Sequence, residues 1–336
     1  MTRFILSHEA DDAMNVASIS LKEWCVYMAD LRNCETMLNK IMIPLPDLLN
    51  TVLALDVSAM DIDQVENLIK FCESKEEIEK LKNCAGGDRE MLGKCEEVFA
   101  ELMKVPRIEA KLRVLGFKIA CVSKVQDLRR CLNTIINATK EMNESAKLHQ
   151  IMQTISTHEN LASSVGSEVD SLVKVSDNMA LMHELCKLVG ESMPELLDFG
   201  NDLVHLEAAS KIELKSVVEK MEAFVHVLNE VKEEYMASEN DGAISMGFRY
   251  ATYDFLHPLE YEAMWVDTLY EEATRIIDSY LAKFPARYTI EEVTKTVNNF
   301  MKTFIKCRRK KIERQAKGKK KITEKETMNI EQNKHL

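Results

Sequence analysis

The sequence predicts an all-α fold, and three observations lead to this prediction. Glycine and proline are scarce, with 10 and 6 among 336 residues, so the chain lacks the turn residues of an all-β fold. Apolar residues make up 46% of the chain and recur at intervals of three and four residues from about residue 21 onward. No stretch shows the alternation of apolar and polar residues that is typical of a strand.

The first predicted elements follow a divergent N-terminal arm at residues 1–20, where no periodicity is present. A helix is predicted at residues 62–72, because the apolar residues there fall on one face of a 3.6-residue period. A loop is predicted at residues 85–88, and Asp88 can cap the helix that follows it.

Three later helix starts are predicted from capping boxes. In this motif a hydroxyl accepts a hydrogen bond from an unpaired backbone N–H, and a glutamate three residues on bonds back to the first residue. The three pairs are Ser74 with Glu77, Ser192 with Glu195, and Thr289 with Glu292.

Two heptad seams predict long helices near the C-terminal end. The first has alternating spacings of three and four residues and comprises Leu214, Val217, Met221, Phe224, Leu228, Val231 and Tyr235. Such a seam needs a partner helix, which an intramolecular bundle or an intermolecular coiled coil would supply. The second comprises Val293, Val297, Phe300 and Phe304, and one expectation is that the two stretches pair in antiparallel orientation.

Charge is distributed unevenly along the chain. The net charge is −11, but residues 302–325 carry +10 and the remainder carries −21. Residues 311–336 are therefore predicted to be a disordered basic tail. A solvated run of charge is one interpretation; contact with an acidic polymer, contact with an anionic membrane surface and nuclear import are others. The basic residues concerned are Lys306, Arg308, Arg309, Lys310 and Lys311.

No motif indicates chemistry, so the chain is predicted not to be an enzyme and to have no catalytic, cofactor-binding or metal-binding residues. Phosphate-binding glycine motifs are missing, and the nine cysteines include no Cys-x-x-Cys pair. The acidic pair Glu233 and Glu234 is expected to be solvated. Nucleic-acid binding is not expected, because no aromatic residues are interleaved with the basic ones. Without a signal peptide or a long apolar run, a cytoplasmic protein with reduced thiols is expected.

Six segments are similar to parts of the formin homology 2 domain, most closely to its plant versions. The similarity extends from about residue 31 to residue 306 and includes uncommon strings such as Lys-Val-Pro-Arg and Leu-Glu-Ala-Ala-Ser-Lys. The segments are residues 41–47, 61–72, 92–95, 101–113, 194–199 and 206–211.

This resemblance implies an elongated helical domain at residues 21–310 that associates with actin at filament barbed ends and promotes nucleation. By analogy, residues 21–120 are knob-like, 121–200 are post-like, and 201–310 are coiled-coil-like. Formin homology 2 domains form head-to-tail dimers, so a homodimer or association with other formin chains is implied, together with a cytoskeletal location.

Several departures from the family pattern predict impaired activity. The N-terminal lasso is expected to be lacking, with Trp24 as its sole candidate residue. In the post, Glu159 and Asn160 stand in a degraded lasso-receiving segment, and a loop after Asp177 is deleted. The six prolines form no proline-rich run, so profilin recruitment is not expected.

The candidate actin contacts implied by the resemblance are basic residues and one knob position. Thr36 occupies the knob position where the family has an isoleucine. The full set is Thr36, Lys40, Lys104, Arg107, Lys111 and Arg113. The alternative function is that of a helical interaction protein without actin activity, which binds other formins, microtubules or a membrane surface through its coiled coil and basic tail.

Overall fold

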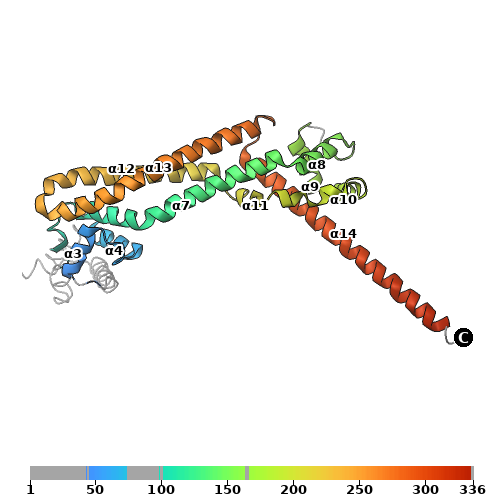
Figure 1. Ribbon diagram of the computed structural model, residues 1–336, viewed down its shortest axis with the longest axis horizontal. Coiled ribbons are helices and arrows are strands. Elements are labelled where there is room, and N and C mark those ends of the chain that lie inside the picture. Colours follow the sequence, from blue (N-terminus) through green and yellow to red (C-terminus); the bar gives the residue numbers. More distant parts are fainter. Residues whose placement is uncertain (1–42, 44, 74–97, 99–100, 163–165, 334–336) are drawn as a thin grey trace, which may run out of the picture. The chain divides into compact units, whose positions relative to one another are not determined.

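The computed structural model describes residues 43, 45–73, 98, 101–162 and 166–333. Every regular element in these residues is a helix, which confirms the predicted all-α class (Figure 1). The predicted N-terminal arm, Trp24, the pair Ser74 and Glu77, and the loop with Asp88 lie outside the described residues.

The chain divides into two compact units. The first unit contains the described residues up to Gln126 together with Ala223–Ala263, and the second contains Asp127–Glu222 together with the residues from Met264 onward. Three long helices contribute residues to both units: α7 (Ile108–Glu144), α12 (Leu214–Ala237) and α13 (Met246–Leu281). The division into knob-like, post-like and coiled-coil-like parts stays a prediction.

In the first unit, α3 (Leu45–Ala54) and α4 (Ile62–Glu73) accompany the long helices, and η3 (Ser238–Ser245) joins α12 to α13. Helix α4 confirms the predicted helix at residues 62–72, and Val65 and Leu68 are fully buried. A reciprocal cap begins α4, since Gln64 N–H donates to Asp61 Oδ1 at 2.8 Å and Asp61 N–H donates to Gln64 Oε1 at 2.9 Å. This cap was not predicted from the sequence.

Aromatic rings join the long helices of the first unit. The ring of Phe117 on α7 lies 5.4 Å from that of Phe224 on α12 and 6.2 Å from that of Phe255 on α13. Leu228 and Val231 of the first heptad seam are also buried. These seam residues therefore pack inside one chain, as the intramolecular interpretation predicts.

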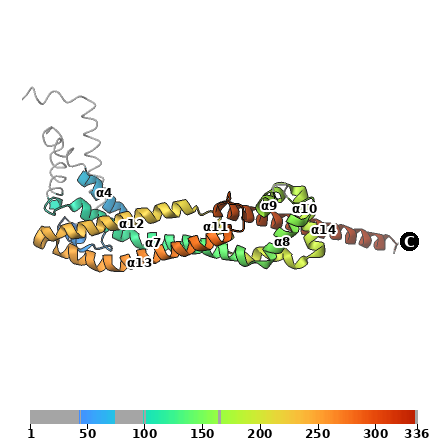
Figure 2. The ribbon, with the colours of Figure 1, turned by 90° about the horizontal axis from the view of Figure 1, so that it is seen from above.

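The second unit is built from short helices, α14 (Ile290–Asn333) and the parts of α7, α12 and α13 that fall within it. Helix α14 packs against α9 and α10 (Figures 1 and 2). The second seam is fully buried in this core, so it packs on these short helices instead of pairing with α12 as one expectation had it. The other elements are α8 (Ala146–Thr157), α9 (Glu168–Asp177), α10 (Met179–Ser192), η2 (Pro194–Asp202) and α11 (Leu206–Ala209).

One predicted capping box of this unit is confirmed and one is wrong. Thr289 N–H donates to Glu292 Oε2 at 2.9 Å, and Glu292 N–H donates to Thr289 Oγ1 at 3.3 Å, which is the reciprocal pattern. Ser192 instead ends α10, and Met193 is the residue that precedes η2. Pro194 causes this shift, because the residue before a proline is kept out of the helical region.

The C-terminal end of the chain differs from the predicted disordered tail. Residues 311–333 continue α14 as a helix. Lysine, arginine, glutamate and glutamine dominate this stretch, and they are good helix formers; no proline interrupts it. None of the described helices combines the length and apolar character needed to cross a membrane.

Candidate partner-binding sites

Two of the predicted actin-contact residues are exposed: Lys104, which precedes α7, and Arg113, which lies in the second turn of α7. Lys104 Nζ pairs with Glu101, and Arg113 donates to Glu109 Oε1 at 2.8 Å. Exposed pairs of this kind contribute little and exchange partners readily. Both cations can therefore face an acidic partner. Thr36 and Lys40 lie outside the described residues.

Lys111 does not belong to this exposed surface, which corrects the sequence prediction. Its side chain is 0% exposed. Its ammonium donates to Glu234 Oε1 at 2.7 Å, to Asp241 Oδ2 at 2.9 Å and to the carbonyl oxygen of Pro106 at 2.7 Å. These three acceptors match the three donors of an ammonium group. The same contacts show that Glu234, which was expected to be solvated, is buried.

Arg107 binds the same two carboxylates from the solvent side. Its Nε donates to Glu234 Oε2 at 2.9 Å, and a terminal nitrogen donates to both oxygens of Asp241 at 2.9 Å. The hydrogen bond to Glu234 is the main reason that the pKa of Arg107 is raised. The guanidinium is therefore committed within the chain, although 39% of the side chain remains exposed.

We call Arg107, Lys111, Glu234 and Asp241 the buried charge cluster. It joins the start of α7 to the end of α12 and to η3, and its two positive and two negative charges balance. Burial raises the pKa of Asp241, but hydrogen bonds from Lys111, Ser245 and Arg107 outweigh this and hold the pKa below its usual value. Because both carboxylates and the ammonium are paired within the unit, the cluster is a structural element of the first unit.

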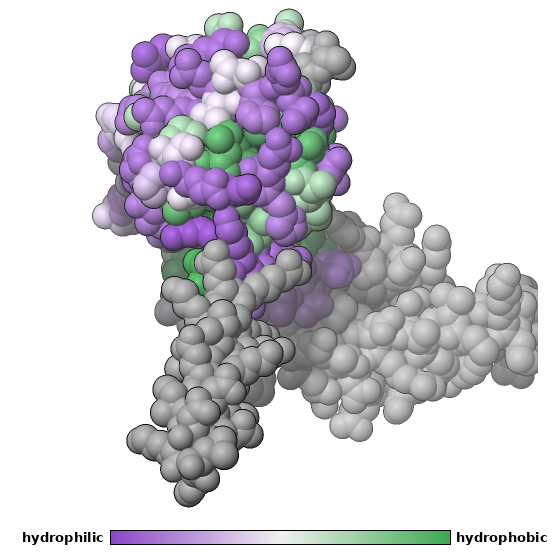
Figure 3. Space-filling view, turned by 90° about the vertical axis from the view of Figure 1, so that its right-hand side faces the viewer, coloured by the Kyte–Doolittle hydropathy of each residue, from purple (hydrophilic) through white to green (hydrophobic). Residues whose placement is uncertain are grey.

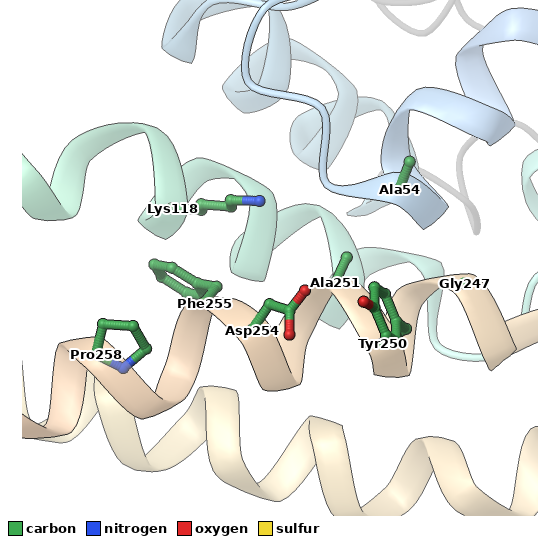
Figure 4. Close-up of a pocket in the computed structure, with 8 residues that line it drawn as sticks. All are labelled: Ala54, Lys118, Gly247, Tyr250, Ala251, Asp254, Phe255 and Pro258. Carbon is green, nitrogen blue, oxygen red and sulfur yellow. The ribbon is translucent and has the colours of Figure 1, made fainter.

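A separate pocket of about 680 Å³ opens on the first unit (Figure 4). One face of α13 forms most of its wall, and α3 and α7 contribute one residue each. The lining is mainly apolar, with one acid and one base. The lining residues are Ala54, Lys118, Gly247, Tyr250, Ala251, Asp254, Phe255 and Pro258.

In the second unit, the segment predicted to be a degraded post contacts α9 and α10. Glu159 is exposed, whereas Asn160 Nδ2 donates to Glu184 Oε1 at 3.3 Å and its carbonyl accepts from Lys174 Nζ at 3.0 Å. Asn178 alone connects α9 to α10, and its Oδ1 accepts from Ala180 N–H at 3.0 Å. The two helices are thus joined without a loop.

The basic residues of the predicted tail begin where α14 leaves the core. Cys307 is fully buried, whereas Lys306, Arg309 and Lys310 are exposed and Lys311 is half-buried. Arg308 donates to the carbonyl oxygen of Leu197 at 2.7 Å, which fixes the helix to η2. Seen from the right-hand side of Figure 1, the coloured surface is mainly hydrophilic with small apolar patches (Figure 3).

The described residues thus form an all-helical protein in which long helices carry charged and apolar surfaces. Comparison with known families assigns it further, because residues 28–305 match the Formin Homology 2 Domain. The chain belongs to this family.

The relatives that it resembles include plant formin-like proteins. It is 58% identical over 322 residues to Formin-like protein 14 of Arabidopsis thaliana, and the alignment covers 90% of this chain and 26% of that protein. It is 52% identical over 305 residues to Formin-like protein 12 of the same plant, and the alignment covers 90% of this chain and 99% of that protein. Formin-like protein 3 of rice is 53% identical over 302 residues, and the alignment covers 84% of this chain and 24% of that protein. The chain therefore spans about a quarter of two of these relatives and nearly all of the third.

Proposed function

We propose that this chain associates with actin filaments and binds their barbed ends. The observation that carries the proposal is membership of the formin homology 2 family across residues 28–305. The exposed cations Lys104 and Arg113 support it, because an acidic filament surface attracts positive charge. Lys111 is left out of the proposed contact surface, since its charge is buried and paired.

The proposed activity is weak, with little or no processive nucleation. Three features motivate this part of the proposal. Asn178 joins α9 directly to α10, so no loop extends there to supply a post contact. Glu159 occupies a position where the resemblance implies glycine, and Thr36 one where it implies isoleucine. Replacing isoleucine by threonine removes apolar contact area worth on the order of 1–2 kcal/mol.

The remaining parts of the proposal follow from the same assignment. The chain acts by binding and has no catalytic activity and no cofactor. Its location is cytoplasmic and cytoskeletal, its oligomer is a homodimer or a complex with other formin chains, and it does not recruit profilin.

Barbed-end elongation from preformed actin seeds tests this function. The chain is titrated into the assay, and its molar mass in solution is measured on the same preparation. We expect slowed elongation at saturating chain and little new filament formation from monomeric actin. A well-folded chain without any effect on elongation would contradict barbed-end binding. Nucleation as strong as that of an intact formin homology 2 domain would contradict the impaired activity.

A second candidate function is favoured by the exposed basic part of α14. Exposed Arg309 and Lys310 can attach the chain to other formin chains, to microtubules or to an anionic membrane without any actin activity. The heptad seam does not support this role, since Phe224, Leu228 and Val231 are already buried. Cosedimentation with microtubules, and with vesicles with and without anionic lipid, tests it. Binding that is unaffected by Arg309→Glu with Lys310→Glu would contradict it.

A further inference from the structure

The pocket on the first unit is a site that the actin proposal does not use. Its volume of about 680 Å³ lies within the range of about 300–1,000 Å³ found for ligand sites. Gly247 and Ala251 lie one turn apart on α13 and line the hollow with little side-chain bulk, and the rings of Tyr250 and Phe255 also line it (Figure 4). An apolar side chain from outside therefore finds both space and apolar walls.

The polar groups around this hollow are mainly hydrogen-bond acceptors. Asp254 places a carboxylate at the wall. Pro258 sits inside α13 and has no N–H, so it cannot donate to the carbonyl of Asp254 four residues earlier. Helix α3 ends at Ala54 in the same wall, and a helix C-terminus carries partial negative charge. These three features favour an occupant that brings a positive charge and hydrogen-bond donors.

The single cation in the lining, Lys118, is already used within the unit. Its Nζ donates to the carbonyl oxygen of Leu55 at 3.0 Å and lies 5.8 Å from the ring centroid of Phe255. The nearby carboxylate of Asp56 accepts from Ser58 and adds a further negative charge beside Lys118. Lys118 thus balances the α3 terminus, so the acceptors that remain for a cation from outside are the carboxylate and the carbonyl of Asp254.

The exposed basic part of α14 has the complementary chemistry. Ile312 is an isolated apolar residue within a run of cations, and its side chain is 54% exposed. Arg309 lies three residues earlier, on the same helix face, and its pair with Glu313 is a long, exposed one at 3.5 Å. Residues 302–325 carry +10 against −21 for the remainder of the chain, which favours their attraction to an acidic surface.

We infer that this pocket receives the basic part of α14 from a second copy of the chain. Ile312 of the second copy enters the hollow beside Gly247 and Ala251, and Arg309 of that copy pairs with Asp254. The pocket is open on the first unit and Ile312 is exposed on α14, so each surface is accessible to a partner. The contact requires no actin; it rests on the proposed homodimer, for which it supplies a contact surface.

Fluorescence anisotropy with a labelled peptide of residues 302–325 tests the inference. The acceptor is the full chain carrying Ile312→Asp, whose own basic helix cannot compete for the pocket. We expect Asp254→Lys, or Ala251→Trp to fill the hollow, to weaken peptide binding about ten-fold or more. The matched control is Asp267→Lys, the same charge change at another exposed aspartate of α13, which should weaken binding less than about two-fold.

The peptide variants keep the test independent of the folding of the acceptor. A peptide carrying Ile312→Asp should bind about ten-fold more weakly to the unchanged acceptor, although it loses only one charge of many. Equal binding of the two peptides would contradict binding in the pocket, and so would an equal loss of affinity with Asp254→Lys and Asp267→Lys. Either result would mean that the peptide is held only by diffuse charge attraction.

Sedimentation of the intact chain separates a second copy from an intramolecular contact. We expect Ile312→Asp and Asp254→Lys each to lower the average molar mass over a micromolar dilution series. If Ile312→Asp strengthens peptide binding while the molar mass stays constant, the basic helix occupies the pocket of its own chain, and the inference of a second copy is wrong.

Discussion

Lys111 and Glu234 form an ion pair with 2.7 Å between Nζ and Oε1, and both side chains are buried. The two residues are 123 positions apart in the sequence, one on α7 and one on α12. A charge that is taken out of water needs its partner, because an unpaired buried charge is strongly unfavourable. The packing of α7 against α12 in the first unit therefore depends on Lys111.

Replacing Lys111 by methionine should strongly destabilise the first unit. The change keeps the apolar stem but leaves the carboxylates of Glu234 and Asp241 with less compensation, which costs about 3–5 kcal/mol. Urea unfolding followed by circular dichroism measures this loss. Lys104→Met is the matched control, since Lys104 is exposed, and it should change stability by less than about 0.5 kcal/mol. Equal effects of the two changes would contradict the assigned role.

The buried charge cluster also predicts a pH dependence of stability. The pKa of Asp241 is lowered from its ordinary value of 3.8, so the folded state binds this proton less readily than the unfolded state. Its contribution is therefore complete above about pH 3.8 and is lost as the pH falls through the lower folded-state value. The stability difference between the native chain and Asp241→Asn should be large at neutral pH and shrink in acid. A difference that stays constant across this range would contradict the prediction.

The helical fold could be predicted from the sequence because its signals are local. The periodicity at Val65 and Leu68 and the reciprocal cap of Thr289 and Glu292 depend on residues within one or two turns. The capping prediction failed at Ser192, where the constraint of Pro194 on the preceding residue outweighed the hydroxyl–glutamate pattern.

The sites were harder to predict, because their partners are far apart along the chain. The sequence around Lys111 does not distinguish it from an exposed helical lysine. Its partners Glu234 and Asp241 are more than 100 residues away, so no local pattern predicts the contact. The pocket likewise joins Ala54, Lys118 and Asp254, which belong to three helices. Pro258 was a local signal, because a proline inside a helix has no N–H to donate to the carbonyl four residues earlier.

The confirmed capping box gives a smaller and more local prediction. Thr289→Ala removes the acceptor for Glu292 N–H at the start of α14 and should cost about 1 kcal/mol. The urea midpoint of the full chain measures this change. Thr268→Ala is the control, since that exposed hydroxyl bonds only to the carbonyl of Met264 within α13. If Thr268→Ala lowers the stability as much as Thr289→Ala does, the cap contributes no more than an ordinary hydroxyl–carbonyl hydrogen bond within a helix.

Two buried thiols of the second unit should be chemically inert. Burial, together with the neighbouring Cys307 thiol, raises the pKa of Cys186 far above its usual value, so almost none of it is the reactive thiolate. Replacing Cys186 or Cys307 by alanine should leave the number of rapidly reacting thiols unchanged in a native titration with a disulfide reagent. Cys131→Ala, at a half-buried position, is the comparison that should lower the number. Loss of a fast thiol on changing Cys186 would contradict its burial.

The exposed cations of the first unit give the direct test of how the chain would meet actin. Lys104→Glu and Arg113→Glu reverse charge at exposed positions whose present partners, Glu101 and Glu109, are weakly held. If these cations face an acidic filament end, each reversal should raise the concentration for half-maximal slowing of elongation by about two- to five-fold. The effect should shrink at higher salt, because the Debye length falls below about 8 Å. Arg130→Glu is the matched control, being an exposed arginine of α7 that pairs with Asp127 at 2.8 Å. A loss with Arg130→Glu equal to that with Arg113→Glu would mean that net charge, and not this surface, governs the interaction.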